Sequence, residues 1–165
     1  MKEGTGAGVY GQSLKRRLSF SLGKYTMVFQ AEIYAILACA YDLQSLNRPE
    51  KYISICSDSQ AALKALQAIQ TTSSLVHQCQ KALNDISARH VVELYWVPGH
   101  AGVWGNEIAD GLARSGSALS FLGPEPTLGV SKGDIRKRFS RWLNSQHWAI
   151  WHDPGNTLRQ ARELI

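Results

Sequence analysis

The alternation of short apolar segments with helical spacing in the middle of the chain constrains the fold most strongly. Residues 52–57 (YISICS) and 91–97 are short, rich in β-branched and aromatic residues, and bounded by polar or turn residues, as is typical of strands. Apolar residues recur at helical spacing over 60–69 and 75–89 after the first segment, and over 106–118 after the second. Strands that alternate with helices predict an α/β fold. Because residues 52–57 are nearly all apolar or small, we expect a central strand covered on both faces.

The first part of the chain adds an antiparallel pair and a long helix. Residues 1–12 are glycine-rich and have the composition of the second half of a hairpin. Leu18, Phe20 and Leu22 alternate with polar residues, as in a half-buried strand. Residues 31–46 carry an apolar stripe at helical spacing. An antiparallel opening followed by alternating strands and helices predicts a mixed sheet flanked by helices.

The composition limits size, partners and compartment. A chain of 165 residues suffices for one domain around a single core. The net charge of +5 favours a polyanionic partner. Cys39, Cys56 and Cys79 are odd in number and widely spaced, which indicates reduced thiols rather than a disulfide or zinc framework. No apolar stretch is long enough to cross a bilayer and no signal peptide opens the chain, so we expect a soluble intracellular protein, cytoplasmic or nuclear and not secreted.

The stretch 97–112 (VPGHAGVWGNEIADGL) concentrates polar side chains where a strand ends and a helix begins. His100 lies in a glycine-rich loop. Asn106 is in a position that favours a helix cap, and Glu107 suits the first turn, where we expect a solvated acid more than a secondary metal contact. Asp110 lies on the same helix, on helical surface that neighbours Glu107. Both residues have an alternative to a role in catalysis. Asp110 could be a solvated residue on an exposed face, and His100 could be a loop residue without a role.

Two further acids occupy comparable places. Glu32 lies near the start of the helical run 31–46, and Asp58 ends the strand 52–57. Their alternatives are a first-turn acid favoured by the helix dipole and a cap of the following helix, respectively. Three acids brought from separate elements to one end of a sheet, with a loop histidine, predict a divalent-metal site suited to phosphodiester chemistry.

The last part of the chain, 123–165, is basic and contains tryptophans spaced along a helical segment. The basic residues that crowd this segment are Lys132, Arg136, Lys137, Arg138 and Arg141. One interpretation is a helix whose aromatic residues pack on a neighbour and whose basic face is solvated. The other is a nucleic-acid contact that uses phosphate pairing and aromatic stacking. We therefore expect two parts, a domain over 1–122 and a basic helical tail over 123–165.

Three blocks of the chain together resemble a known family. In order they read FQAEIYAI, SICSDSQAAL and YWVPGHAGVWGNEIADGLA. They resemble successive blocks of a ribonuclease H domain, and are most similar to the domain at the C-terminal end of non-LTR (LINE-type) retrotransposon reverse transcriptases. The resemblance covers residues 4 to about 118, and each block alone would be a weak signal.

The resemblance implies a five-stranded mixed sheet flanked by helices, two Mg²⁺ or Mn²⁺ ions, and cleavage of the RNA strand of an RNA–DNA hybrid. It assigns Glu32, Asp58 and Asp110 as metal-binding catalytic carboxylates and His100 as a loop histidine that helps the product leave or positions water. It also implies the polymerase region of the same polyprotein as a partner.

The sequence departs from the family pattern at its start. The family pattern begins with a strand that ends in an aspartate, usually within T-D-G-S, and Met1 follows that point. We therefore expect the first, central strand and one metal-bridging carboxylate to be missing. The consequence would be weak or no cleavage, and the alternative function is a non-catalytic nucleic-acid-binding module or remnant.

Overall fold

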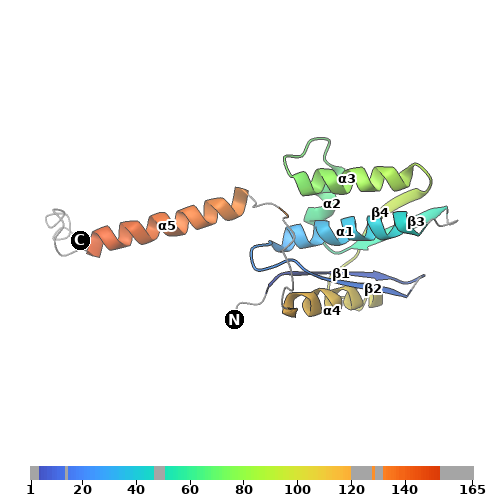
Figure 1. The fold of residues 1–165 in the computed structure, drawn as a ribbon, viewed down its shortest axis with the longest axis horizontal. Coiled ribbons are helices and arrows are strands. Elements are labelled where there is room, and N and C mark those ends of the chain that lie inside the picture. The colour runs from blue at the N-terminus through green and yellow to red at the C-terminus, as the bar shows by residue number, and fades with distance from the viewer. Residues whose placement is uncertain (1–3, 14, 47–50, 120–127, 129–131, 153–165) are drawn as a thin grey trace. The chain divides into compact units, whose positions relative to one another are not determined.

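The computed structural model describes residues 4–13, 15–46, 51–119, 128 and 132–152. The chain divides into two compact units, Met1–Gly129 and Val130–Ile165, and each is described by itself. Figure 1 shows the first unit as strands and helices in layers, which confirms the α/β fold class and is consistent with a ribonuclease H-like fold.

The first sheet is an antiparallel pair, β1 (Gly6–Gly11) and β2 (Arg16–Ser21). Apolar residues pair across it, with Val9 opposite Leu18. α1 (Val28–Ser45) packs on β1, and α4 (Trp104–Ala118) covers both strands from the opposite side (Figure 1). This sheet is therefore held between two helices.

Glycines let α4 approach the first sheet closely. A Cβ atom on Gly8 would lie 2.1 Å from the carbonyl oxygen of Ala109, and one on Gly6 would lie 2.0 Å from that of Ala113. No side chain fits at either position. The contact fixes α4, and with it Asp110, against the face of β1.

The second sheet is a parallel pair, β3 (Tyr52–Ser57) and β4 (Val91–Trp96). The connection between them carries α2 (Gln60–Gln67) and α3 (Ser74–Ser87). Both helices, with α1 (Val28–Ser45), cover one face of this sheet and enclose the main core. The largest fully buried side chains in this core are Ile33, Val76, Cys79 and Ile86.

The expectation of a central strand over residues 52–57 is wrong for the residues that the structure describes. β3 pairs with β4 alone, and the strands form two two-stranded sheets rather than one mixed sheet. Ile55 is buried against the helices, whereas Ser54 and Cys56 on the opposite face are exposed. The small residues of this strand predicted that both of its faces are covered by other elements. In the structure Ser54 and Cys56 instead line an open groove.

α4 (Trp104–Ala118) begins before the predicted start at Asn106. Its N-cap is Val103, so the interpretation of Asn106 as the cap is wrong. Asn106 lies inside the first turn, and its side chain is directed to another element. Glu107 is in the first turn, as predicted.

The second unit contains α5 (Lys132–His152). Of the basic residues predicted to contact nucleic acid, Arg136, Lys137, Arg138 and Arg141 are exposed, and the side chain of Lys132 lies outside the described part.

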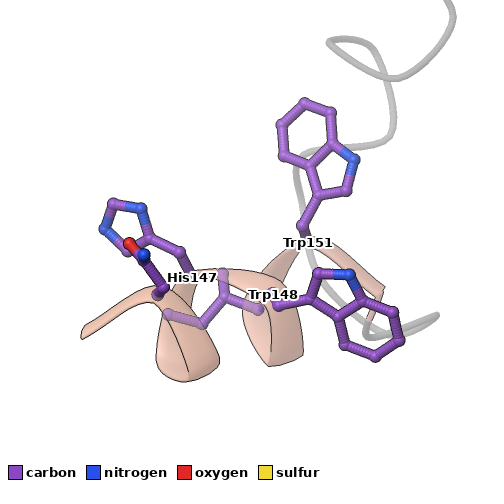
Figure 2. Close-up of a pocket in the computed structure, with 5 residues that line it drawn as sticks. His147, Trp148 and Trp151 are labelled. Carbon is purple, nitrogen blue, oxygen red and sulfur yellow. The ribbon is translucent and has the colours of Figure 1, made fainter. Parts of the chain in front are cut away.

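Aromatic residues gather at the end of α5. Trp148 stacks on His152 with ring centroids 3.8 Å apart. Figure 2 shows His147, Trp148 and Trp151 at this end of the helix, where they line a pocket that has no carboxylate among its described lining residues. Among the described residues, no helix is long and apolar enough to span a membrane.

Candidate functional site

Glu32, Asp58 and Asp110 come from three separate elements and line one cavity of about 600 Å³. Glu32 is on α1, Asp58 follows β3, and Asp110 is on α4. Asn106 lines the same cavity. The structure thus brings together the three carboxylates that the sequence analysis singled out.

Glu32 lies beyond the first turn of α1, which contains no acid. The alternative role of a first-turn acid favoured by the dipole is therefore wrong. Burial raises the pKa of Glu32 to about 7, and the charges of Asp58 and Asp110 add to the increase. A carboxylate that is partly desolvated and faces two like charges holds its proton more tightly. A bound cation would remove this repulsion.

Asp58 is not the cap of the helix that follows it. The cap is Ser59, whose Oγ accepts the backbone N–H of Ala62 at 3.2 Å. The carboxylate of Asp58 instead accepts a hydrogen bond from Nδ2 of Asn106 at 3.3 Å. The indole N–H of Trp96 donates to the backbone carbonyl of Asp58 at 3.0 Å. Asp58 is thus oriented from both α4 and the end of β4.

Gly99 leaves the space that the Asp58 carboxylate occupies. A Cβ atom at Gly99 would lie 2.7 Å from Oδ2 of Asp58, closer than real side chains approach. No role was predicted from the sequence for Gly99 or Trp96, and Asn106 was predicted only as a helix cap. Their proximity in sequence to His100 was the available signal, and the contact with Asp58 depends on tertiary structure.

Asp110 is partly buried, which contradicts the alternative of a solvated residue on an exposed face. Its Oδ2 atom is buried and accepts no hydrogen bond from the residues described, while Nδ1 of His100 lies 3.4 Å away. Burial and, next, the charge of Asp58 raise the pKa of Asp110, while His100 and Arg114 oppose the increase. A buried carboxylate oxygen without a hydrogen-bond donor is a ready ligand for a cation.

His100 is held in a strained backbone conformation beside Asp110. Its φ is 53°, in the left-handed region that residues with a Cβ seldom adopt. The ring is largely exposed, so it is accessible from solvent while its Nδ1 faces the carboxylate. This arrangement is suited to a group that transfers a proton or positions water.

Glu107 joins His100 and Asp110 in a second grouping. One ligand atom from each of these three residues lies within 4.8 Å of the others. Glu107 is half-buried rather than fully solvated. It is therefore placed to contact a cation bound near Asp110. From the sequence, a solvated first-turn acid was favoured over such a metal contact.

The donor set fits a hard divalent cation. Glu32, Asp58 and Asp110 offer carboxylate oxygens, and Mg²⁺ and Mn²⁺ prefer oxygen ligands. Burial first, and then the charges of neighbouring carboxylates, raise the pKa values of Glu32 and Asp110, and a cation would offset the repulsion between the charges.

The sequence model of the RNase H family matches residues 1–118. The chain belongs to the RNase H family. The match contains all four residues assigned to the site, Glu32, Asp58, His100 and Asp110, and ends at the last residue of α4.

Individual RNase H relatives match shorter segments. Ribonuclease H of Paramagnetospirillum magneticum is 58% identical over 38 residues, which cover 23% of this chain and 25% of that protein. The enzyme of Nitrosomonas eutropha is 56% identical over 36 residues, 22% of each chain. That of Hyphomonas neptunium is 53% identical over 36 residues, 22% of this chain and 24% of the relative. The aligned segments thus span about a quarter of these relatives or less.

Proposed function

We propose that this RNase H chain carries a metal-dependent endonuclease site that cleaves the RNA strand of RNA–DNA hybrids. The observation that carries the proposal is the convergence of Glu32, Asp58 and Asp110 on one cavity, with the buried Oδ2 atom of Asp110 lacking a hydrogen-bond donor among the described residues. The three relatives named above are each called ribonuclease H, which supports the same reaction.

Each residue of the site has a distinct role in this proposal. Glu32, Asp58 and Asp110 would hold two Mg²⁺ or Mn²⁺ ions, with Glu107 as a further contact. Asn106 orients Asp58 through its amide hydrogen bond. When bound, such ions activate a water nucleophile and stabilise the leaving oxygen of a phosphodiester. His100 exchanges a proton or orients water at the solvent-facing side of Asp110.

The substrate is bound through its shape and backbone. An A-like duplex presents 2′-hydroxyls and phosphates in a wide minor groove, so recognition depends little on base sequence. The net positive charge of the chain attracts such a polyanion.

Free thiols at Cys39, Cys56 and Cys79 are in keeping with a reducing compartment, the cytoplasm or nucleus.

The origin that we propose is a LINE-type retrotransposon polyprotein, whose polymerase region would be a partner. The blocks around Glu32, Asp58 and His100, followed by a basic helix with spaced tryptophans, support it. We further propose that these 165 residues alone cleave weakly or not at all, because the family pattern adds a carboxylate from a preceding strand.

The test is cleavage of a labelled RNA–DNA hybrid in Mg²⁺ and in Mn²⁺. The chain is compared with a version extended upstream by a strand that ends in aspartate, each with Asp58→Asn and Asp110→Asn variants. We expect the extended form to cut RNA in the hybrid but not single-stranded RNA, and either substitution to reduce the rate by about 10²-fold or more. Metal-independent cleavage, or full activity in both variants, would refute the proposed site.

A second candidate is a non-catalytic nucleic-acid-binding module. The observation that favours it is the exposed basic and aromatic surface of α5, with Arg136, Lys137, Arg141 and Trp148 among the exposed residues. This module would bind the hybrid in EDTA and would tolerate alanine at Glu32 and Asp58. Binding without cleavage by the extended form would favour this candidate.

A further inference from the structure

α5 lies beyond the residues that match the RNase H family, and its exposed side chains form two different stripes. The apolar stripe, at helical spacing, consists of Ile135, Phe139 and Trp142. The mixed stripe combines basic, amide and aromatic side chains at the same kind of spacing and consists of Lys137, Arg141, Asn144 and Trp148. With 3.6 residues per turn, the two stripes lie on opposite sides of the helix.

The mixed stripe leads into a pocket at the end of α5. The pocket has a volume of about 510 Å³, and its described lining residues are Asn144, His147, Trp148, Ile150 and Trp151. Figure 2 shows that the rings of His147, Trp148 and Trp151 project from this part of the helix. Flat rings and one amide thus line a space within the range of small-ligand sites, about 300–1,000 Å³.

Trp148 is held by a neighbour and still offers much of its indole ring. The imidazole of His152 stacks on the indole with ring centroids 3.8 Å apart and an angle of 19° between the planes. Nδ1 of His152 also lies 2.9 Å from the carbonyl oxygen of Trp148. Trp148 is nevertheless 66% exposed. Because the ring is already positioned, stacking of a second flat ring on it costs little conformational freedom.

The charge of α5 indicates which flat ligand suits this surface. The helix contains five Lys or Arg residues and a single acid, Asp134, and the pocket has no carboxylate among its described lining residues. This balance favours an anionic ligand over a cationic one. A nucleotide combines an anionic phosphate, which pairs with Lys or Arg, with a flat base, which stacks on Trp. The Asn144 amide can donate and accept hydrogen bonds, as base edges do.

Two other anionic surfaces match the mixed stripe less well. A helix that lies on an anionic membrane separates its apolar residues from its charged ones, whereas Trp148 is in line with Lys137 and Arg141. A nucleic-acid duplex offers phosphates, but its bases are stacked on one another, and exposing one of them costs unstacking energy. Unpaired nucleotides offer both groups without this cost.

We propose that the mixed stripe and the pocket of α5 form a binding site for unpaired nucleotides of single-stranded nucleic acid. Trp148 stacks on a base, while Arg141 and Lys137, roughly 10 and 16 Å away along the helix, pair with phosphates of neighbouring nucleotides. The site uses residues of α5 alone. The inference therefore goes beyond hybrid cleavage and does not depend on it.

Binding of labelled oligothymidylate to the 165-residue chain tests the proposal. The chain is titrated in EDTA with a single strand of about twelve nucleotides and with a blunt DNA duplex of the same length. We expect the single strand to bind about tenfold or more tightly than the duplex, because only unpaired bases can stack on Trp148. Trp148→Ala should weaken single-strand binding by about tenfold or more and should leave duplex binding unchanged.

Two further variants separate stacking from a general effect on the helix. Trp142→Ala is the matched control, because it removes the same kind of ring from the apolar stripe, and it should leave single-strand affinity nearly unchanged. Trp148→Phe should keep most of the affinity, since phenylalanine also stacks, but should lose most of the quenching of tryptophan fluorescence by oligothymidylate. Far-UV circular dichroism checks that each variant keeps its helix.

Three results would overturn the proposal. These are equal affinity of the parent for the single strand and the duplex, an unchanged single-strand affinity in Trp148→Ala, and an equal loss in Trp142→Ala. All of these measurements are made without cleavage. A negative result here would therefore leave the proposed endonuclease site unaffected, and failure of that site would leave these expectations unchanged.

Discussion

At the scale of residues, the site depends on the neighbours that position its carboxylates as much as on the carboxylates themselves. Asp58 accepts hydrogen bonds from the side chain of Asn106 and from the indole of Trp96. The absence of a side chain at Gly99 leaves space for its carboxylate. The sequence places these residues near the acids, but their contacts with Asp58 join elements that are far apart along the chain.

Substitution of Gly99 tests that space. Gly99→Ala would place a Cβ atom 2.7 Å from Oδ2 of Asp58, so the carboxylate must move. We expect about a tenfold or larger loss of hybrid cleavage in the extended form, with a small change in Tm because the carboxylate is at the end of a flexible side chain. Gly111→Ala is the control, since a Cβ atom there meets nothing within 4 Å and alanine favours a helix. Equal activity of both variants would show that the position of Asp58 is unimportant.

The raised pKa of Glu32 predicts a pH-dependent cost to folding. Its ordinary value of 4.5 rises to about 7 in the folded chain, so between these values the folded state binds more protons than the unfolded state. Stability therefore falls as the pH increases from about 4.5 to about 7. Glu32→Gln removes this loss, and we expect the variant to be more stable than the parent at pH 7.5 by about 1–3 kcal/mol.

Denaturant unfolding at several pH values measures this difference. Below about pH 4 the parent and Glu32→Gln should have similar stability, because Glu32 is protonated in both states. Mg²⁺ should stabilise the parent at neutral pH more than the variant. A stability difference that is the same at every pH would contradict the assignment to Glu32.

At the scale of elements, the approach of α4 to the first sheet determines where Asp110 and His100 lie. The approach requires glycine at three places, Gly6, Gly8 and Gly116, where a Cβ atom would come within 2.5 Å of a backbone atom of the opposite element. Glycine-rich composition near the start of the chain predicted a hairpin. It did not predict that a helix distant along the chain packs on it.

Gly8→Ala tests this packing. The added methyl group meets the backbone of α4, which cannot yield as a side chain would, so we expect a loss of about 1–3 kcal/mol in unfolding free energy. Gly11→Ala in the same strand is the control, because its Cβ atom would make an ordinary contact, 3.5 Å from Cβ of Arg16. Equal destabilisation by both substitutions would indicate a general intolerance of β1 rather than the contact with α4.

At the scale of the whole molecule, two units with different surfaces share one chain. The RNase H match ends at residue 118, before α5 begins at Lys132. The predicted boundary at residues 122 and 123 stays a prediction, because residues 120–127 lie outside the described part.

Neutralising α5 measures its role in binding. The test changes Arg136, Lys137 and Arg141 to Gln. If α5 binds phosphates, this variant should bind the hybrid more weakly, and by a similar factor whatever the base sequence of the hybrid. The slope of log K against log salt should become shallower by about 2 to 3, near one for each phosphate that is no longer neutralised. Exchange of the exposed Gln67 and Gln70 for Ala, which leaves the charge unchanged, is the control. An unchanged slope would favour a packing role for α5.

The sequence alone determined the α/β class, the order of most elements and the three acids of the candidate site. Apolar periodicity is a local property, so the helices around Ile33 and Ile86 and the strand through Ile55 were predicted close to their observed bounds. The family resemblance placed Glu32, Asp58 and Asp110 together, and their assignment as metal ligands stays a prediction.

Tertiary structure decided how the strands pair and what surrounds each acid. The four described strands form two sheets with a groove between β1 and β3, and this arrangement depends on which edges meet in space. Asn106 is a clear example, because the residue preference predicted a cap, whereas packing directs its amide to Asp58. Local sequence sets which backbone conformation each segment prefers. Burial, charge repulsion and hydrogen bonding between distant segments exist only once the chain has folded, and these interactions give the carboxylates their proposed chemistry.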